Sequence, residues 1–196
     1  MKLYYARGAC SLSNRISLHE AGLPFDEEAV DLTAKATATG QDFMALNPKG
    51  YVPLLVLDDG QSVTENIAVL SLIADLAPQL LPEGPLGRIR MLEMLSFISS
   101  ELHIAFKPFF HRAGEAECAQ AAVRITNLLE LASAGISDGF LYGSRFTPAD
   151  AYLFVILMWA TKFAVPVPER LLAYFDRAKM RPSVSRALSE EGLGVG

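Results

Sequence analysis

The pattern of apolar residues changes near residue 80, and this change constrains the fold more than any other feature of the chain. Before it, short apolar runs typical of strands alternate with helical spacings. After the Pro- and Gly-bearing segment 81–85, only helical patterns occur. The net charge of −5 lies entirely in the first part, because acidic and basic residues balance beyond residue 80. We therefore expect two unlike domains, residues 1–77 and residues 87–196.

The first half of the smaller domain predicts a strand, a helix and a second strand. Residues 3–6 form a short apolar run, and helical spacing from Leu12 to Leu23 follows. Alternation over residues 25–32 indicates another strand, which a right-handed crossover would place parallel to the first. Residues 33–40 are small, polar and aperiodic, which favours a surface loop.

The second half predicts a helical turn that ends at Asn47, then a hairpin, then a helix. Residues 54–57 and 61–64 flank a turn with glycine at Gly60. Thr64 is a good N-cap for a helix that runs to Pro78. The predicted order is β-α-β-α-β-β-α, a mixed sheet with helices on it. The rest of the chain predicts helices over residues 86–112, 115–134, 147–164, 168–179 and 183–190, with a capping box at Thr147 and Asp150.

Composition excludes several classes of function. A sequence pI of about 5.2 without a basic cluster argues against nucleic-acid binding. No apolar stretch has the length of a membrane span, and the N-terminal apolar stretch is shorter than a signal-peptide core, so we expect a cytoplasmic protein that does not bind membranes. Cys10 and Cys118 form no disulfide framework, and no His, Cys or acidic residues have metal-ligand spacing.

Cys10 is the most informative candidate for chemistry. It follows the first strand and begins the first helix, where free backbone N–H groups and the helix dipole favour a thiolate. We expect this position to lower the pKa of the Cys10 thiol. The motif Cys-x-x-Ser, formed with Ser13, is the single-cysteine version of a thioredoxin-like redox site. The alternative is that Cys10 is a small residue without a chemical role.

Two further sites could hold a peptide-like ligand. Val52-Pro53 opens a strand, and a cis peptide bond there would leave the Val52 backbone free to pair with a ligand, although most X-Pro bonds are trans. Glu65 and Asn66 begin the next helix, where a backbone N–H can bind a carboxylate and the Glu65 side chain an ammonium. Glu65 could also be no more than a favourable first-turn acid. With Cys10, the three sites describe a ligand shaped like γ-Glu-Cys-Gly.

At this point the chain resembles the cytosolic glutathione transferases over essentially its full length, most closely the bacterial beta class. The matching segments are residues 1–5 and 10–13, residues 45–50 and 52–54, residues 64–65, and residues 146–152. The resemblance implies an α/β plus all-α protein, in which a thioredoxin-like N-terminal βαβαββα domain precedes a C-terminal all-helical bundle. It also implies a homodimer.

The resemblance implies roles for nine residues. Those near the glutathione sulfur are Cys10, which can form a mixed disulfide in this class, the hydroxyl-bearing Ser11 and Tyr5, and His103, which could equally be a partly buried helix histidine. Those that bind the rest of glutathione are Lys35 at the glycyl end, Val52 and Pro53 at the cysteinyl part, and Glu65 and Asn66 at the γ-glutamyl end. Ser11 is the stronger hydrogen-bond donor of the two hydroxyls.

The function implied is conjugation of the glutathione thiolate to small hydrophobic electrophiles, a detoxification reaction. Glutathione is then a co-substrate, and no metal is expected. Residues 88–110 and 159–163 would line or support the electrophile pocket. Two alternatives stay open: a glutathione-dependent thiol–disulfide reductase that acts through Cys10, and a non-catalytic protein that binds glutathione or apolar ligands.

Overall fold

The structure is a computed structural model that describes residues 1–134, 136 and 139–194. The chain divides into two compact units, each described here by itself. The N-terminal unit contains Met1–Leu80 together with the C-terminal segment from Pro182, and the helical unit contains Leu81–Arg181. The predicted helical domain 87–196 is therefore wrong at its C-terminal end, and its residues 135, 137–138 and 195–196 lie outside the described residues.

The N-terminal unit is built on a five-stranded sheet with the order β3-β2-β1-β4-β5. Its elements in chain order are β1 (Lys2–Tyr5), α1 (Ser11–Ala21), β2 (Asp26–Asp31), β3 (Ala36–Thr37), α2 (Phe43–Leu46), β4 (Leu54–Val56), β5 (Ser62–Thr64), α3 (Asn66–Leu76), η1 (Pro78–Leu80) and α9 (Pro182–Glu190). As predicted, β1 and β2 are parallel and β4 and β5 form an antiparallel hairpin. The short strand β3 lies in the segment that the sequence predicted as loop, and it pairs with β2.

Alternation along β1 produces two apolar layers, one on each face of the sheet. Leu3 packs with residues of α1, β4 and α3, among them Leu18, Leu55 and Ile73. The neighbouring Tyr4 belongs to the other layer, with Phe43 of α2 and residues near β4. The buried faces of α1 and α3 thus hold the ends of these helices against the sheet, where the candidate residues lie.

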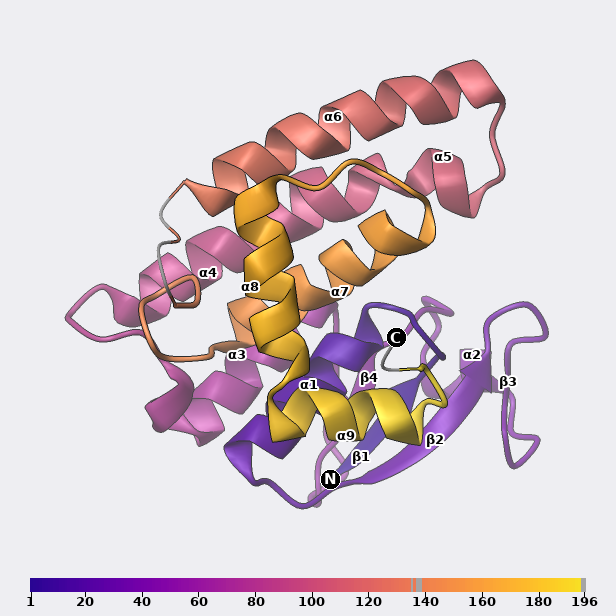
Figure 1. The fold of residues 1–196 in the computed structure, drawn as a ribbon. Helices are drawn as coiled ribbons and strands as arrows, with labels where there is room; N and C mark the ends of the chain where they lie inside the picture. Colours follow the sequence, from indigo (N-terminus) through magenta and orange to yellow (C-terminus); the bar gives the residue numbers. More distant parts are fainter. Residues whose placement is uncertain (135, 137–138, 195–196) are drawn as a thin grey trace. The chain divides into compact units, whose positions relative to one another are not determined.

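The C-terminal helix α9 belongs with α1, although more than 160 residues separate them along the chain (Figure 1). Ser183 donates a hydrogen bond of 2.5 Å to a Glu20 carboxylate oxygen, and a Glu190 oxygen lies 2.6 Å from His19 Nε2. The periodicity of residues 183–190 predicts a helix but carries no information about its partner. The sequence therefore could not assign this helix to the N-terminal unit.

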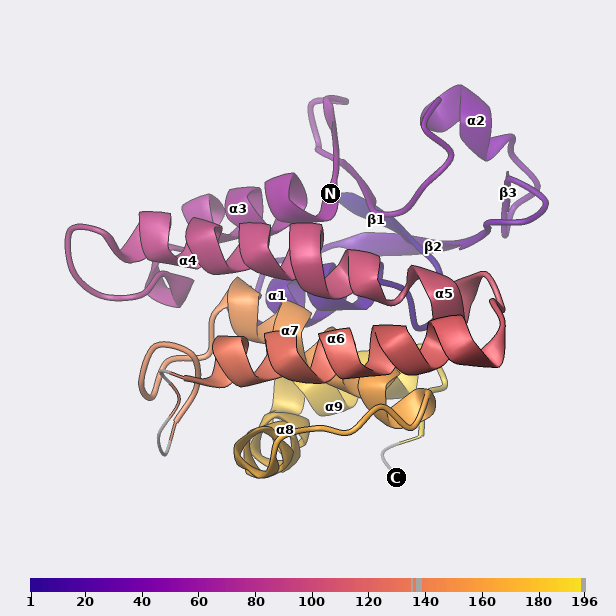
Figure 2. The same cartoon turned by 90° about the horizontal axis from the view of Figure 1, so that it is seen from above.

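The helical unit contains α4 (Gly87–Phe97), η2 (Ile98–His103), α5 (Lys107–Phe110), α6 (Glu115–Ser133), α7 (Pro148–Lys162) and α8 (Glu169–Lys179). The single helix predicted over residues 86–112 is wrong, because this stretch is divided into α4, the π-helical η2 and α5. Figure 2 shows α4 and α5 at the two ends of this stretch. At the start of α4 a Cβ on Gly87 would lie 1.9 Å from the Pro82 carbonyl oxygen, so only glycine fits there.

Helix α7 is the buried centre of the helical unit, and its start confirms the predicted capping box. The Thr147 hydroxyl accepts from the Asp150 N–H, and the Asp150 carboxylate accepts from the Thr147 N–H at 2.8 Å. Asp150 is fully buried and also accepts a hydrogen bond of 2.9 Å from the Tyr174 hydroxyl. Burial raises the pKa of this carboxyl group above its ordinary value. Asp150 is therefore a structural residue, as the sequence predicted.

Candidate active site

Cys10 lies at the N-terminus of α1, but its thiol differs from the sequence prediction. Burial raises the pKa of the Cys10 thiol to about 12, against the smaller lowering effects of the Cys10 and Ser11 backbone N–H groups. The Glu65 carboxylate raises it further. The expectation of a lowered pKa is therefore wrong, because loss of water around the sulfur outweighs the helix terminus. Cys10 is a neutral thiol at physiological pH.

The Cys10 thiol donates a hydrogen bond to the Val52 carbonyl oxygen, with the sulfur 3.7 Å from that oxygen. Val52-Pro53 is a cis peptide bond, although most X-Pro bonds are trans. Val52 precedes β4 and lies outside the ladder that begins at Leu54. Cys10 and Val52, which are 42 positions apart in the sequence, are thus neighbours.

The two predicted hydroxyl groups are engaged within the fold. The Ser11 side chain is fully buried, and its oxygen accepts a hydrogen bond of 3.2 Å from the Ala6 N–H. The Tyr5 ring lies over the Arg15 guanidinium, whose central carbon is 4.0 Å from the ring centroid. The Ser11 hydroxyl therefore stabilises the loop before α1, and the Tyr5 ring packs on the buried Arg15 guanidinium.

Glu65 and Asn66 mark the start of α3. Glu65 has a positive φ of 71°, so the helix begins after it and the predicted N-cap at Thr64 is wrong. The Glu65 side chain is exposed, whereas Asn66 is buried and its amide donates a hydrogen bond of 3.1 Å to the Ser13 hydroxyl. That hydroxyl in turn donates a hydrogen bond of 2.6 Å to the Cys10 carbonyl oxygen. Through Ser13 the start of α3 is tied to the turn that carries Cys10.

Lys49 lies on the loop between α2 and β4, and the Lys35 side chain reaches this loop. Lys35 Nζ donates a hydrogen bond of 2.9 Å to the Gly50 carbonyl oxygen. Lys49 Nζ donates to a Glu65 carboxylate oxygen at 2.6 Å and to the Thr64 hydroxyl at 3.0 Å. The structure thus connects Lys35, the loop before Val52 and the start of α3. Lys49 lies in the segment 45–50 that carries the family resemblance, but the resemblance implied no role for it.

His103 belongs to the helical unit, at the end of η2. Its Nδ1 lies 2.6 Å from the Tyr152 hydroxyl oxygen, and its ring lies 4.8 Å from the Trp159 ring, centroid to centroid. Burial, with a smaller contribution from the Lys107 charge, lowers the pKa of His103 to about 4. His103 is therefore neutral above that pH.

An aromatic cluster surrounds His103 within the helical unit. Its other members are Phe106, Phe109, Phe110, Trp159 and Phe163. They come from the two stretches that the sequence analysis assigned to an electrophile pocket, and the fold brings these stretches together. Phe106 and Trp159 of the cluster are buried, whereas Phe110 is 41% exposed, and so is Ile104, which follows His103 in the sequence, at 42%.

Comparison with known proteins identifies the family. A family model described as the N-terminal domain of glutathione S-transferase matches residues 8–76. Glutathione S-transferase GstA of Escherichia coli O157:H7 is 41% identical over 201 residues, which cover 98% of this chain and 100% of that protein. The chain belongs to the glutathione S-transferase family.

Solved structures place this glutathione S-transferase in the bacterial beta class. The beta-class glutathione S-transferase of Sphingomonas chungbukensis superposes with a TM-score of 0.89 at 41% identity, covering 99% of this chain and 100% of that one. A sphingomonad glutathione S-transferase solved in complex with glutathione gives the same TM-score of 0.89 and the same coverage. The fold class predicted from the sequence, a thioredoxin-like domain with a helical domain, is confirmed.

A buried charged cluster, which the sequence did not predict, lies beside the Cys10 loop of this glutathione S-transferase. Arg15 of α1 is fully buried and forms ion pairs with Glu27 and with Glu191, whose Oε1 lies 3.6 Å from Arg15 Nη1. Glu191 Oε2 also accepts a hydrogen bond of 2.6 Å from the Gly8 N–H. Burial raises the pKa of Glu191 to about 7. The only signal in the sequence was a charged residue next to the apolar Ile16 in the first helix.

Neither a metal site nor a membrane-spanning helix is found among the described residues of this transferase. Across residues 1–134, 136 and 139–194, no group of three or more His, Cys, Asp and Glu side chains could hold a metal ion. Within the same residues, none of the helices has both the length and the apolar character of a membrane span.

Proposed function

We propose that this glutathione transferase conjugates glutathione to small hydrophobic electrophiles as a detoxification reaction. One observation carries the proposal. Within the N-terminal unit, the Cys10 thiol lies against the Val52 carbonyl, and Ser13 connects the Cys10 turn to the start of α3 at Glu65 and Asn66. A thiol locus, a free strand end and a helix N-terminus are the three features that a γ-Glu-Cys-Gly tripeptide requires.

Each part of glutathione has a proposed partner on this unit. The Val52 backbone, held by cis Pro53, pairs with the cysteinyl residue. The Asn66 N–H binds the γ-glutamyl carboxylate and the exposed Glu65 side chain binds its ammonium, while Lys35 serves the glycyl end. The Asn66 side chain is bound to Ser13, so only its backbone is offered to the ligand.

The reactive sulfur is that of glutathione, and Cys10 is its neutral hydrogen-bond donor. A thiol whose pKa is raised to about 12 is a poor nucleophile at neutral pH, and this favours conjugation over a reductase that acts through Cys10. When glutathione displaces the Val52 carbonyl as acceptor, the Cys10 S–H can donate to the bound thiolate. Ser11 supports this geometry through its bonds to Ala6, and Tyr5 through its packing on Arg15.

The reaction is a nucleophilic substitution or addition. The glutathione S–H bond breaks and its proton passes to solvent. The thiolate electron pair then forms a bond to an electrophilic carbon, and with an aryl chloride the carbon–chlorine bond breaks and chloride leaves. We assign the electrophile to the aromatic cluster around His103, in which the partly exposed Phe110 ring suits a flat apolar molecule.

A conjugation assay with 1-chloro-2,4-dinitrobenzene tests the function. We expect turnover that saturates with glutathione, a fall in kcat/KM of roughly tenfold or more in Cys10→Ala, because one hydrogen-bond donor to the thiolate is lost, and little change in the matched control Cys118→Ala. Retention on immobilised glutathione without turnover would instead identify a binding protein. Disulfide reduction that disappears in Cys10→Ala while conjugation persists would identify a reductase.

We further propose a cytoplasmic homodimer. Helices α4 and α6 of the helical unit, with the residues just before α4, carry exposed apolar side chains that a second subunit could cover, namely Leu86, Ile89, Val123 and Leu131. Light scattering should then give twice the chain mass of 21.3 kDa, and Leu131→Glu should shift the protein toward the monomer. Cell fractionation tests the location, and a monomer at micromolar concentration would refute the dimer.

A further inference from the structure

The loop that carries Lys49 is held by hydrogen bonds on both sides of this residue, and the Lys49 side chain reaches Glu65 at the start of α3. Asn47 is buried, and its side chain donates a hydrogen bond of 2.7 Å to the Tyr51 carbonyl oxygen and accepts one of 3.2 Å from the Lys49 N–H. The Gly50 carbonyl is bound by Lys35 at 2.9 Å. The Lys49 backbone is therefore fixed on both sides, and its ammonium lies 2.6 Å from a Glu65 carboxylate oxygen.

The ion pair that results contributes little to folding. The Lys49 side chain is 52% exposed and that of Glu65 67% exposed, so water screens the attraction between them. Its distance of 2.6 Å is nevertheless that of a direct charge-assisted hydrogen bond, and the Thr64 hydroxyl at 3.0 Å orients the ammonium further. An exposed pair with this much local support is better explained by recognition than by stability.

The γ-glutamyl end of glutathione carries an ammonium and a carboxylate on the same carbon atom. A site that recognises such a zwitterion needs a negative and a positive group side by side, and Glu65 and Lys49 are such a pair. The Lys49 ammonium donates to a Glu65 carboxylate oxygen, which is the kind of acceptor that the ligand ammonium would also need. The charges stay balanced if the ligand ammonium replaces Lys49 as the partner of Glu65 and the ligand carboxylate replaces Glu65 as the partner of Lys49.

We propose that Lys49 is a specificity-determining residue that binds the α-carboxylate of the γ-glutamyl group while Glu65 binds its ammonium. The inference rests on the proposed function, since it names a further contact of the same glutathione site. The carboxylate then has two partners, the Asn66 backbone N–H at the start of α3 and the Lys49 ammonium. The site would then bind γ-glutamyl thiols more tightly than thiols that lack the ammonium or the carboxylate.

The opposite role is physically distinct and predicts the opposite sign. If Lys49 only blocked Glu65, its removal would free the carboxylate and tighten glutathione binding. If Lys49 binds the ligand carboxylate, its removal weakens binding. The sign of the change in Kd for Lys49→Gln therefore decides between the two roles.

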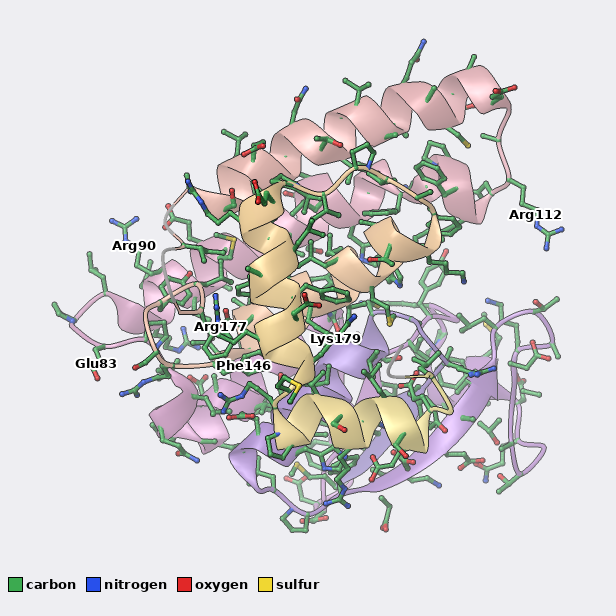
Figure 3. All side chains as sticks on the ribbon, in the orientation of Figure 1. Glu83, Arg90, Arg112, Phe146, Arg177 and Lys179 are labelled. Atoms are coloured by element: carbon green, nitrogen blue, oxygen red, sulfur yellow. The ribbon has the colours of Figure 1, made fainter. Side chains whose placement is uncertain are left out.

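Calorimetric titration of the full chain with glutathione tests the proposal. We expect Lys49→Gln to raise the Kd for glutathione about 3- to 10-fold, an effect that shrinks at high salt, and Lys49→Arg to restore most of the affinity. The analogue 4-aminobutanoyl-Cys-Gly, which lacks the α-carboxylate, should bind Lys49→Gln at least as tightly as wild type, because it gains no contact from Lys49 and competes with it for Glu65. The control Lys179→Gln removes the same charge from α8 of the helical unit (Figure 3) and should leave both Kd values unchanged.

Several outcomes would overturn the inference. They are a Kd for glutathione that is unchanged or lower in Lys49→Gln, and an equal loss for glutathione and for the decarboxylated analogue. Failure of the proposed function is a separate result, because wild type would then show no binding of glutathione at all. If wild type and Lys49→Gln bind glutathione equally well, the role of Lys49 is refuted but the proposed function is not.

Discussion

The N-terminal unit holds two groups of paired charges that differ in burial, and the contrast separates stability from recognition. Arg15, Glu27 and Glu191 form a cluster in which the Arg15 and Glu191 side chains have no solvent exposure. Lys49 and Glu65 form a pair in which both side chains are more than half exposed. Buried charges lose their water and depend on one another, whereas exposed charges can exchange partners with a ligand at little cost.

The largest expected effect is on the buried cluster. Arg15→Met should lower the free energy of unfolding by about 3 kcal/mol or more, because it leaves the Glu191 carboxylate buried without its cation. Urea unfolding measures the change. Arg186→Met, which removes a 66% exposed arginine paired with Glu190, is the matched control and should cost less than about 1 kcal/mol.

Equal stability of the Arg15→Met variant and wild type would break the comparison. It would mean that the cluster tolerates the loss of its cation as readily as an exposed pair does. Adding Glu191→Gln to Arg15→Met should recover part of the loss, since the second change removes the unpaired charge.

The next largest expected effect is the pH dependence of the contribution of Glu191 to folding stability. The pKa of Glu191 is about 7 in the folded chain, above its ordinary value of 4.5, so the folded state holds this proton more tightly than the unfolded state. The contribution of Glu191 to stability is therefore fully present below pH 4.5 and is lost as the pH rises through 7. The size is up to about 2 kcal/mol, allowing for relaxation around the group.

Thermal or urea unfolding of Glu191→Gln between pH 4 and 8 measures this contribution. Subtracting the profile of the variant from that of wild type should leave a curve that falls with pH in that window. A flat difference would show that the Glu191 carboxylate is ionised as easily in the folded chain as in the unfolded one, and the buried cluster would then resemble the exposed pair.

The smallest expected effect is on the exposed pair of Lys49 and Glu65. Lys49→Gln should change the free energy of unfolding by less than about 0.5 kcal/mol in the absence of glutathione, although we expect it to weaken glutathione binding. The same urea measurement serves here. A loss above about 1 kcal/mol would show that the Lys49 pair stabilises the fold and would remove the distinction between the two groups.

Local patterns predicted most of the elements because their causes are local. The parallel pair β1 and β2, the hairpin β4 and β5, and the capping box at Thr147 each follow from residues close together in sequence. The errors arose where local signals compete with the backbone or with burial. Thr64 has the chemistry of an N-cap, but the positive φ of Glu65 delays the helix by one position.

The candidate site divides in the same way. Cys10 at a helix N-terminus, and Val52, Glu65 and Asn66 at element ends, could be named from sequence because strand ends and helix starts are local features. The neutral state of Cys10, the Asn66–Ser13 bond and the Lys49–Glu65 pair could not, because each depends on a partner 15 or more positions away or on the exclusion of water.

The amino-acid sequence alone therefore determined the family and the two-part architecture, since these depend on motifs and periodicity, and it named the candidates that we propose for glutathione binding. Only the tertiary structure decided that the C-terminal helix α9 completes the N-terminal unit, that Glu191 lies buried against Arg15 and Gly8, and that burial reverses the expected shift of the Cys10 pKa. The physical reason is that desolvation and long-range pairing are properties of the packed chain, and no local pattern encodes them.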